Sequence, residues 1–83
     1  MNYKIAIKKS VIRDLKKIDG PNRDRILIKI ENELPAKAET FPVLTGQFSG
    51  LRKFRIGDYR VIYTILEKTV LILRVRHRKD AYR

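Results

Sequence analysis

Four cationic side chains lie close together in the stretch LRKFRIGDYRVIY, residues 51–63: Arg52, Lys53, Arg55 and Arg60. The dipeptide Gly57-Asp58 is a strong signal for a two-residue β-hairpin turn. With this turn, Arg55 lies directly opposite Arg60, and Lys53 shares their face of the hairpin. Like charges in opposite positions destabilise a sheet. Their presence therefore predicts a site that binds an anion.

The chemistry available to such a site is the cleavage of RNA without a metal. The 2′-hydroxyl attacks the adjacent phosphate, which requires a base, an acid for the 5′-oxygen and cations around the developing charge. Arginine binds phosphoryl oxygens in a bidentate manner, and Lys53 or His77 can transfer protons. Pairing through a two-residue turn at Glu67-Lys68 sets Arg60 opposite Val75 and places His77 on the face of Lys53, Arg55 and Arg60. Alternatively, His77 is solvated or only contacts a phosphate.

The segment RHRKDAYR, residues 76–83, adds further cations and one aromatic ring. Arg78 joins the candidate catalytic residues, and Tyr82 can stack on an exposed base or donate a proton. The alternative for Tyr82 is packing of the chain end. The residues predicted to contact RNA without chemistry are Arg52, Arg76, Lys79 and Arg83.

The charge of the chain supports a polyanionic partner. Lys and Arg total 20 against 9 acidic residues, a formal charge of +11, which is most easily explained by nucleic acid. The alternative is a charge that only maintains solubility. Arg13, Lys16 and Lys17 are expected to form a solvated helix face, with contacts to a ribosome as the functional alternative.

The composition also excludes several classes of site. The chain has no Cys and one His, so neither a metal site nor another cofactor is expected. No apolar run approaches the roughly 20 residues of a membrane-spanning helix, and no signal peptide is evident. A length of 83 residues is typical of a single domain, 1–83, which we expect in the cytoplasm.

Hydrophobic periodicity predicts the elements that hold these residues. Residues 2–8 alternate as a strand, and Ser10 is expected to cap a short helix with Val11, Leu15 and Ile18 on its apolar face. A second helix is expected with Pro21 in its first turn, and it is expected to stop before Pro35. Residues 36–50 form a loop anchored by apolar side chains: Phe41, Val43, Leu44 and Phe48.

Three strands are predicted for the rest of the chain, at residues 51–56, 59–66 and 69–75. The order βααβββ predicts an α+β domain in which a helical hairpin covers one face of a four-stranded, mainly antiparallel sheet. The hairpin alternation places Phe54, Ile56, Tyr59, Val61 and Tyr63 in the core under the helices. The other face stays partly open, where the cations lie.

The order βααβββ, together with RKFRIGDYRVIY and HRKDAYR, resembles the RelE/ParE superfamily of bacterial and archaeal toxins over essentially the whole chain. RelE-type members are ribosome-dependent endoribonucleases that cleave mRNA in the A site without metal. Each is neutralised by an antitoxin encoded beside it. The resemblance thus implies mRNA and the ribosome as partners, with an acidic antitoxin that wraps the domain.

The resemblance also implies roles for single residues. Lys53 and Arg55 match the paired basic residues that activate the 2′-hydroxyl and hold phosphate, and Arg60 matches the arginine after the hairpin tyrosine. Arg78 matches the arginine that stabilises or protonates the leaving group, and Tyr82 the tyrosine that orients a base. Arg55 stands where a second lysine can occur. Since arginine stays protonated, the base role shifts toward Lys53 or His77.

Two alternatives to the ribonuclease remain open. ParE-type members share the fold but inhibit DNA gyrase, and they generally lack the full basic and aromatic set. A catalytically inactive, RNA-binding toxin homologue is the other alternative. The set retained in this chain favours the ribonuclease.

Overall fold

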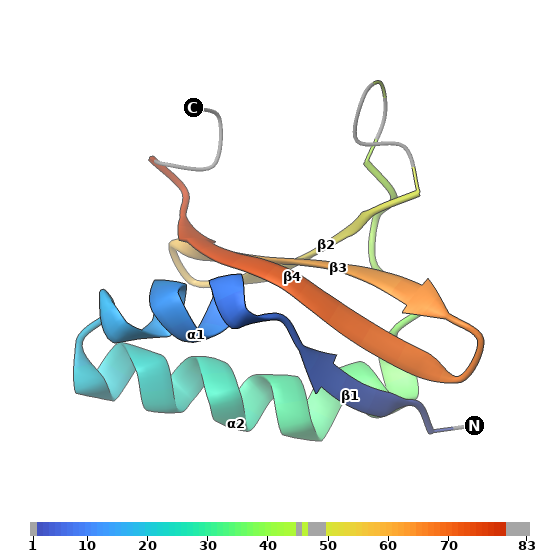
Figure 1. The fold of residues 1–83 in the computed structure, drawn as a ribbon, viewed down its shortest axis with the longest axis horizontal. Helices are drawn as coiled ribbons and strands as arrows, with labels where there is room; N and C mark the ends of the chain where they lie inside the picture. Colours follow the sequence, from blue (N-terminus) through green and yellow to red (C-terminus); the bar gives the residue numbers. More distant parts are fainter. Residues whose placement is uncertain (1, 45, 47–49, 80–83) are drawn as a thin grey trace.

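The computed structural model describes residues 2–44, 46 and 50–79. Two helices and four strands follow in the predicted order βααβββ (Figure 1). Their bounds are β1 Lys4–Ile7, α1 Lys9–Lys16, α2 Gly20–Lys37, β2 Arg52–Ile56, β3 Tyr59–Leu66 and β4 Thr69–His77.

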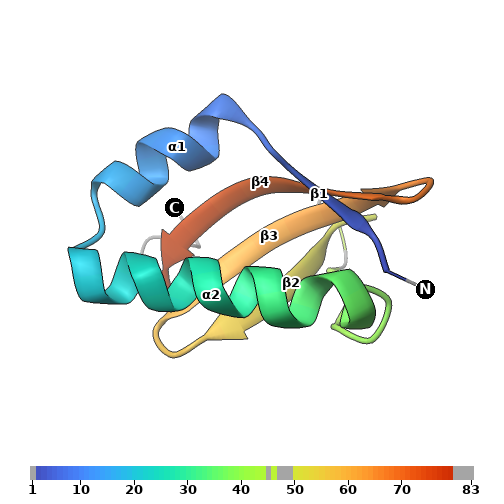
Figure 2. The same ribbon diagram turned by 90° about the horizontal axis from the view of Figure 1, so that it is seen from below.

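The strands form one sheet in the order β1-β4-β3-β2. β1 runs parallel to β4, whereas the β2–β3 and β3–β4 pairs are antiparallel. Both helices lie on the same side of the sheet, with α2 crossing it and α1 beside the outer end of β4 (Figures 1 and 2). The prediction of an α+β fold with a helical hairpin on one face of a mainly antiparallel sheet is therefore confirmed.

The helix ends differ from the prediction at two positions. The N-cap of α1 is Lys8, not Ser10, whose hydroxyl donates a hydrogen bond of 2.7 Å to the carbonyl of Leu73. α2 does not stop before Pro35 but continues to Lys37. Buried residues on either side, Leu34 and Ala38, hold this last turn in the core, and their packing outweighs the hydrogen bond that proline cannot donate.

The start of α2 follows from local chemistry. The side chain of Asp19 accepts hydrogen bonds from the backbone and side-chain nitrogens of Asn22, at 3.2 and 2.9 Å. These bonds lower the pKa of Asp19 below its usual value. Pro21 lies in the first turn of α2 and costs no intrahelical hydrogen bond there, because the first N–H groups of a helix have no intrahelical acceptor.

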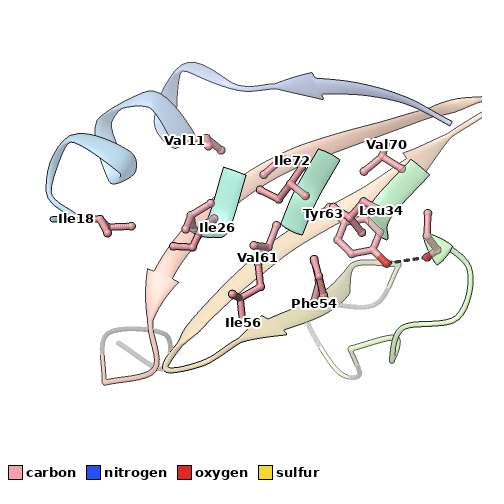
Figure 3. Close-up of a cluster of buried hydrophobic side chains, with 13 residues drawn as sticks. Val11, Ile18, Ile26, Leu34, Phe54, Ile56, Val61, Tyr63, Val70 and Ile72 are labelled. Atoms are coloured by element: carbon pink, nitrogen blue, oxygen red, sulfur yellow. Dashed lines mark hydrogen bonds between the residues drawn. The ribbon is translucent and has the colours of Figure 1, made fainter. Parts of the chain in front are cut away.

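The core lies between the helices and the sheet (Figure 3). Its fully buried side chains come from α1, α2, β3 and β4, and they include Val11, Ile26, Leu34, Val61, Tyr63, Val70 and Ile72. The Tyr63 hydroxyl donates a 2.7 Å hydrogen bond to the carbonyl of Ala38, shown dashed in Figure 3. Burial raises the pKa of Tyr63 to about 12, so the ring stays neutral and anchors the end of α2.

The segment between α2 and β2 is fixed by aromatic stacking and backbone contacts. Phe41 stacks on Phe54 with ring centroids 4.5 Å apart. Val43 forms a bridge to Arg52, although its side chain is half exposed, and Leu44 donates a backbone hydrogen bond to Leu51. Phe48 lies outside the described residues.

A β-bulge in β4 changes the predicted strand register. Beyond the shift, which lies between Ile62 and Tyr63 on β3, Arg60 pairs with Arg76 instead of Val75. An extra residue in β4 reverses the alternation of every later side chain. His77 consequently shares the helix-facing side with Tyr59, and its predicted place beside Arg60 is wrong.

The bulge lies where the neighbour of β4 changes. The first residues of β4, from Thr69 to Ile72, pair with β1. Farther along, α1 replaces β1: the Ser10 hydroxyl binds the carbonyl of Leu73, and Asp14 Oδ2 accepts the N–H of Val75 at 3.0 Å. Side chains of a helix thus satisfy the edge of the strand after the bulge.

Candidate functional site

The turn of the β2–β3 hairpin is the predicted Gly57-Asp58 pair, since Ile56 pairs with Tyr59. Gly57 has a φ of 58°, a conformation that glycine adopts without strain. A β-carbon added there would also lie 3.3 Å from Nη1 of Arg25 on α2. The positive φ favours glycine at this turn, whereas the flexible Arg25 side chain could move away from a β-carbon.

Three arginines form a row across the open face of the sheet. Arg55 pairs with Arg60, and Arg60 pairs with Arg76, so β2, β3 and β4 contribute one each. Adjacent strands lie ~4.8 Å apart, a spacing at which the long side chains of neighbouring arginines can reach a common anion. Lys53 lies on the same face, two residues before Arg55. One lysine and three arginines therefore share the face on which the hairpin predicts an anion site.

Arg76 was expected only to contact RNA, yet it completes this row. The sequence carries a signal for its placement. Unbroken alternation from Val70 and Ile72 would put Arg74 and Arg76 into the core, where unpaired charges are very costly. A bulge between Ile72 and Val75 is the simplest way to keep both arginines out of the core.

Arg52 has a different environment from the row. It pairs with Tyr63 and therefore faces the helix side. Its Nη1 donates hydrogen bonds to the carbonyls of Glu39 and Phe41, at 3.1 and 2.8 Å. This guanidinium thus ties the end of α2 and the following loop to β2.

His77 contacts Tyr59 on the helix side of the sheet. The two rings meet edge to face with centroids 5.3 Å apart and an interplanar angle of 89°. The Nδ1 atom of His77 accepts the backbone N–H of Lys79 at 3.2 Å. The sheet backbone therefore separates the imidazole from Lys53 and Arg60.

Arg78 lies beside the hairpin turn. Its backbone N–H donates a 2.7 Å hydrogen bond to the carbonyl of Asp58, and its Nη1 lies 3.9 Å from Asp58 Oδ1. This contact places Arg78 at the end of the sheet where Arg55 and Arg60 also lie. Lys79 is exposed. Tyr82 and Arg83 lie outside the described residues.

Asp14 is the residue that sequence reasoning missed. Its carboxylate accepts two hydrogen bonds of 2.9 Å from the guanidinium of Arg74 and a third from the N–H of Val75. Burial raises the pKa of Asp14, but these hydrogen bonds outweigh it and hold the pKa below its usual value. An acid one turn after Val11, on the apolar face of α1, was the available signal.

No group of three or more His, Cys, Asp or Glu side chains that could hold a metal ion occurs among the described residues. Within the same part of the chain, no helix is long and apolar enough to span a membrane.

Comparison with known proteins identifies the family of this chain. Residues 5–82 match the family described as ParE toxin of the type II toxin-antitoxin system, parDE. The chain belongs to the RelE/ParE superfamily of toxins. A curated relative of this RelE/ParE chain is toxin RelE3 of Methanocaldococcus jannaschii, 30% identical over 84 residues that cover 95% of the chain and 94% of the relative.

Solved structures extend the likeness to the fold of this RelE/ParE chain. One is the toxin-antitoxin complex RelBE2 from Mycobacterium tuberculosis, with a TM-score of 0.87 and 26% identity, covering 93% of this chain and 99% of that one. Another is the archaeal RelE-RelB complex from Pyrococcus horikoshii, with a TM-score of 0.66 and 31% identity, covering 98% and 100%. The layers described above are therefore those of RelE-like toxins.

Proposed function

We propose that this toxin is a ribosome-dependent, metal-independent endoribonuclease that cleaves mRNA in the A site. The observation that carries the proposal is the row of Arg55, Arg60 and Arg76 on the open face of the sheet, with Lys53 beside it. Directly opposed like charges disfavour folding, so the row has a use that offsets its cost. A phosphodiester in its transition state, which carries extra negative charge, fits that use.

In the proposed reaction the cations of the open face, Arg78 and Tyr82 have separate parts. Lys53, in its neutral form, takes the proton of the 2′-hydroxyl as the 2′-oxygen attacks phosphorus. The arginine row holds the phosphoryl oxygens by bidentate contacts. The bond from phosphorus to the 5′-oxygen breaks, Arg78 stabilises the charge on that oxygen, and solvent supplies its proton. The products are a 2′,3′-cyclic phosphate and a free 5′-hydroxyl, and Tyr82 orients the base.

The base role goes to Lys53 rather than His77 because of the bulge in β4. His77 faces the helices, whereas the attacked phosphate would lie on the open face. Arg55 and Arg60 are unsuitable as bases because guanidinium groups stay protonated. Of the two alternatives for the base, Lys53 is the one on the side of the arginine row.

We further propose a cognate antitoxin with acidic residues as the partner that neutralises this chain in the cytoplasm. The similar structures from M. tuberculosis and P. horikoshii are both toxin-antitoxin complexes. A formal charge of +11 gives such a partner a strong electrostatic attraction. Binding would cover cations that otherwise meet RNA.

Inhibition of DNA gyrase is the second candidate function. The observation in its favour is the match of residues 5–82 to the ParE toxin family. A gyrase inhibitor needs a surface for a protein, and it has no need of an arginine row aligned on one phosphate. The two candidates therefore differ in their dependence on Arg60.

The test is a primer-extension map of a reporter mRNA in a reconstituted translation reaction. Arg60→Ala should lower cleavage by about 100-fold or more, since it removes a charge that stabilises the transition state. Arg60→Lys should be intermediate because it keeps the charge but loses the bidentate contact. Arg13→Ala, which removes an exposed arginine from α1, is the matched control and should cleave normally.

The outcomes separate the candidates. Cuts inside the A-site codon that need ribosomes and disappear with Arg60→Ala support the ribonuclease. Intact mRNA, together with inhibition of gyrase supercoiling that survives Arg60→Ala, would establish the gyrase reading instead. Intact mRNA and unaffected gyrase would leave the chain as an inactive homologue.

A further inference from the structure

A hollow of about 410 Å³ opens between the end of α1 and β4, at the edge of the sheet, where Tyr59 and His77 line it from the helix side and Arg76 of the arginine row borders it. We call it the β4–α1 hollow. Its lining includes Lys17, Tyr59, Arg74, Arg76, His77 and Asp14. The proposed ribonuclease mechanism uses only one of these side chains, Arg76.

The electrostatics of the β4–α1 hollow favour an anion. Three cations, Lys17, Arg74 and Arg76, line it against one carboxylate, Asp14. That carboxylate is already compensated, because it accepts three hydrogen bonds from Arg74 and the N–H of Val75. The charges of Lys17 and Arg76 therefore exceed what the hollow itself neutralises.

Aromatic rings form another part of the wall. Tyr59 and His77 both line the β4–α1 hollow and meet edge to face, at an interplanar angle of 89°. In such a pair one ring presents only its edge to the other, so ring surface remains for a third planar group. Aromatic side chains next to cations are the usual means of holding an unstacked base and its phosphate.

The hollow is continuous with the open face through Arg76. This residue lines the hollow and also pairs with Arg60, the middle residue of the arginine row. β1 pairs with β4 only as far as Ile72, and the hydrogen bonds between α1 and the β4 backbone reach Leu73 and Val75, so Arg76 lies beyond both neighbours of this edge. A chain of nucleotides held on the arginine row can thus pass around the edge and enter the hollow.

We propose that the β4–α1 hollow binds one nucleotide of single-stranded RNA, with its phosphate against Lys17 and Arg76 and its base against Tyr59 and His77. The inference rests on the proposed function only in taking RNA as the ligand. The hollow lies at the edge of β4, next to the face that would hold the cleaved phosphate, and it would select single strands by the base that they expose.

The test uses the chain's one histidine as a reporter, since its ring gives the only set of imidazole signals in the NMR spectrum. The folded protein is titrated with adenosine 5′-monophosphate and, separately, with ribose 5-phosphate. Adenosine 5′-monophosphate should move the His77 and Tyr59 ring signals and bind at least ~5-fold more tightly, because stacking of the base adds to the phosphate contact.

Two lysine variants supply the matched comparison. Lys17→Ala should weaken nucleotide binding by ~2- to 5-fold, the range expected for an exposed ion pair. Lys16→Ala removes the same charge from the same helix, but Lys16 is not part of the lining, so it should bind as the unaltered chain does. Equal effects of the two variants, or equal affinity for the two probes, would overturn the proposal.

Failure of the hollow can be told apart from failure of the ribonuclease. Nucleotide binding with intact mRNA in the translation reaction supports the hollow and refutes the cleavage mechanism. Cleavage without any shift of the His77 signal supports the cleavage mechanism and refutes nucleotide binding in the hollow. A shift caused as strongly by a glutamate-rich peptide as by adenosine 5′-monophosphate would replace the nucleotide with an acidic protein segment.

Discussion

The two faces of the sheet differ in what their side chains contribute. The helix-covered face holds fully buried apolar residues such as Val61, Val70 and Ile72. The open face holds Lys53 and the arginine row, whose mutual repulsion opposes folding. Alternation along the strands lets one segment serve both purposes. The comparison teaches that stability and proposed activity can be altered separately, except at the edge of β4.

That edge is where the two faces depend on each other. Backbone pairing with β1 holds the first part of β4. These backbone hydrogen bonds do not depend on the identity of the side chains. The part beyond the bulge is held by the side chains of Ser10 and Asp14. Because the bulge decides that Arg76 faces outward, substitutions in α1 can affect both stability and the open face.

The largest effect is expected from the helix-covered face. Leu34→Ala removes a fully buried side chain from α2 and should lower the free energy of unfolding by about 2–5 kcal/mol. Urea denaturation followed by circular dichroism measures it. Ile28→Ala, at a position of the same helix that is 57% exposed, should change stability by no more than about 0.5 kcal/mol. Similar losses in the two variants would contradict the assigned core.

Asp14→Asn tests the edge of β4. Loss of the charge-assisted hydrogen bonds to Arg74 should cost about 1.5–3 kcal/mol at neutral pH. Since folding lowers the pKa of Asp14, its contribution is present above about pH 4 and disappears as the pH falls through the lower folded-state pKa. Urea denaturation across this pH range should show the difference between the two proteins shrinking in acid. A difference independent of pH would exclude the carboxylate as its cause.

A smaller loss is expected from Tyr63→Phe. The substitution keeps the buried ring but leaves the carbonyl of Ala38 without its donor, at a cost of about 1–2 kcal/mol. Thermal denaturation measures the change. Since this tyrosine lies in the core, mRNA cleavage by the folded variant should equal that of the unaltered chain. Reduced cleavage at full folding would show that the two faces are coupled here as well.

The smallest effect has the opposite sign. Arg55→Thr relieves the repulsion with Arg60 and should stabilise the fold by about 0.2–1 kcal/mol while lowering cleavage. Arg55→Lys keeps the like charges opposed and should give no such gain. The measurement is the free energy of unfolding of the two variants. A loss of stability in Arg55→Thr would mean that the row does not oppose folding.

Local chemistry explains which parts of the fold could be predicted. Gly57 and its positive φ set the hairpin register, and the faces of β2 and β3 follow from it. The end of α2 could not be predicted at Pro35, because burial of Leu34 and Ala38 depends on tertiary contacts. Propensity is a weak guide where packing decides.

The candidate site was predictable to a similar extent. Arg55 and Arg60 were placed correctly, since a two-residue turn determines their pairing. Arg76 and His77 were not, because the bulge in β4 depends on contacts with α1, which is distant in sequence. The partner of Asp14 was equally hidden: an ion pair between a helix and a strand needs the assembled fold.

The pairing of β1 with β4 joins segments from opposite ends of the chain and has a consequence for the order of folding. The strands β2, β3 and β4 are linked by two tight turns, so their contacts are local and form early, whereas parallel pairing of distant segments is slow. Pulsed hydrogen exchange should therefore protect Val61 before Ile5. The Arg55–Arg60 pair would already exist in the early meander. Arg76 would join it, and the β4–α1 hollow would appear, only when the first strand and helix dock.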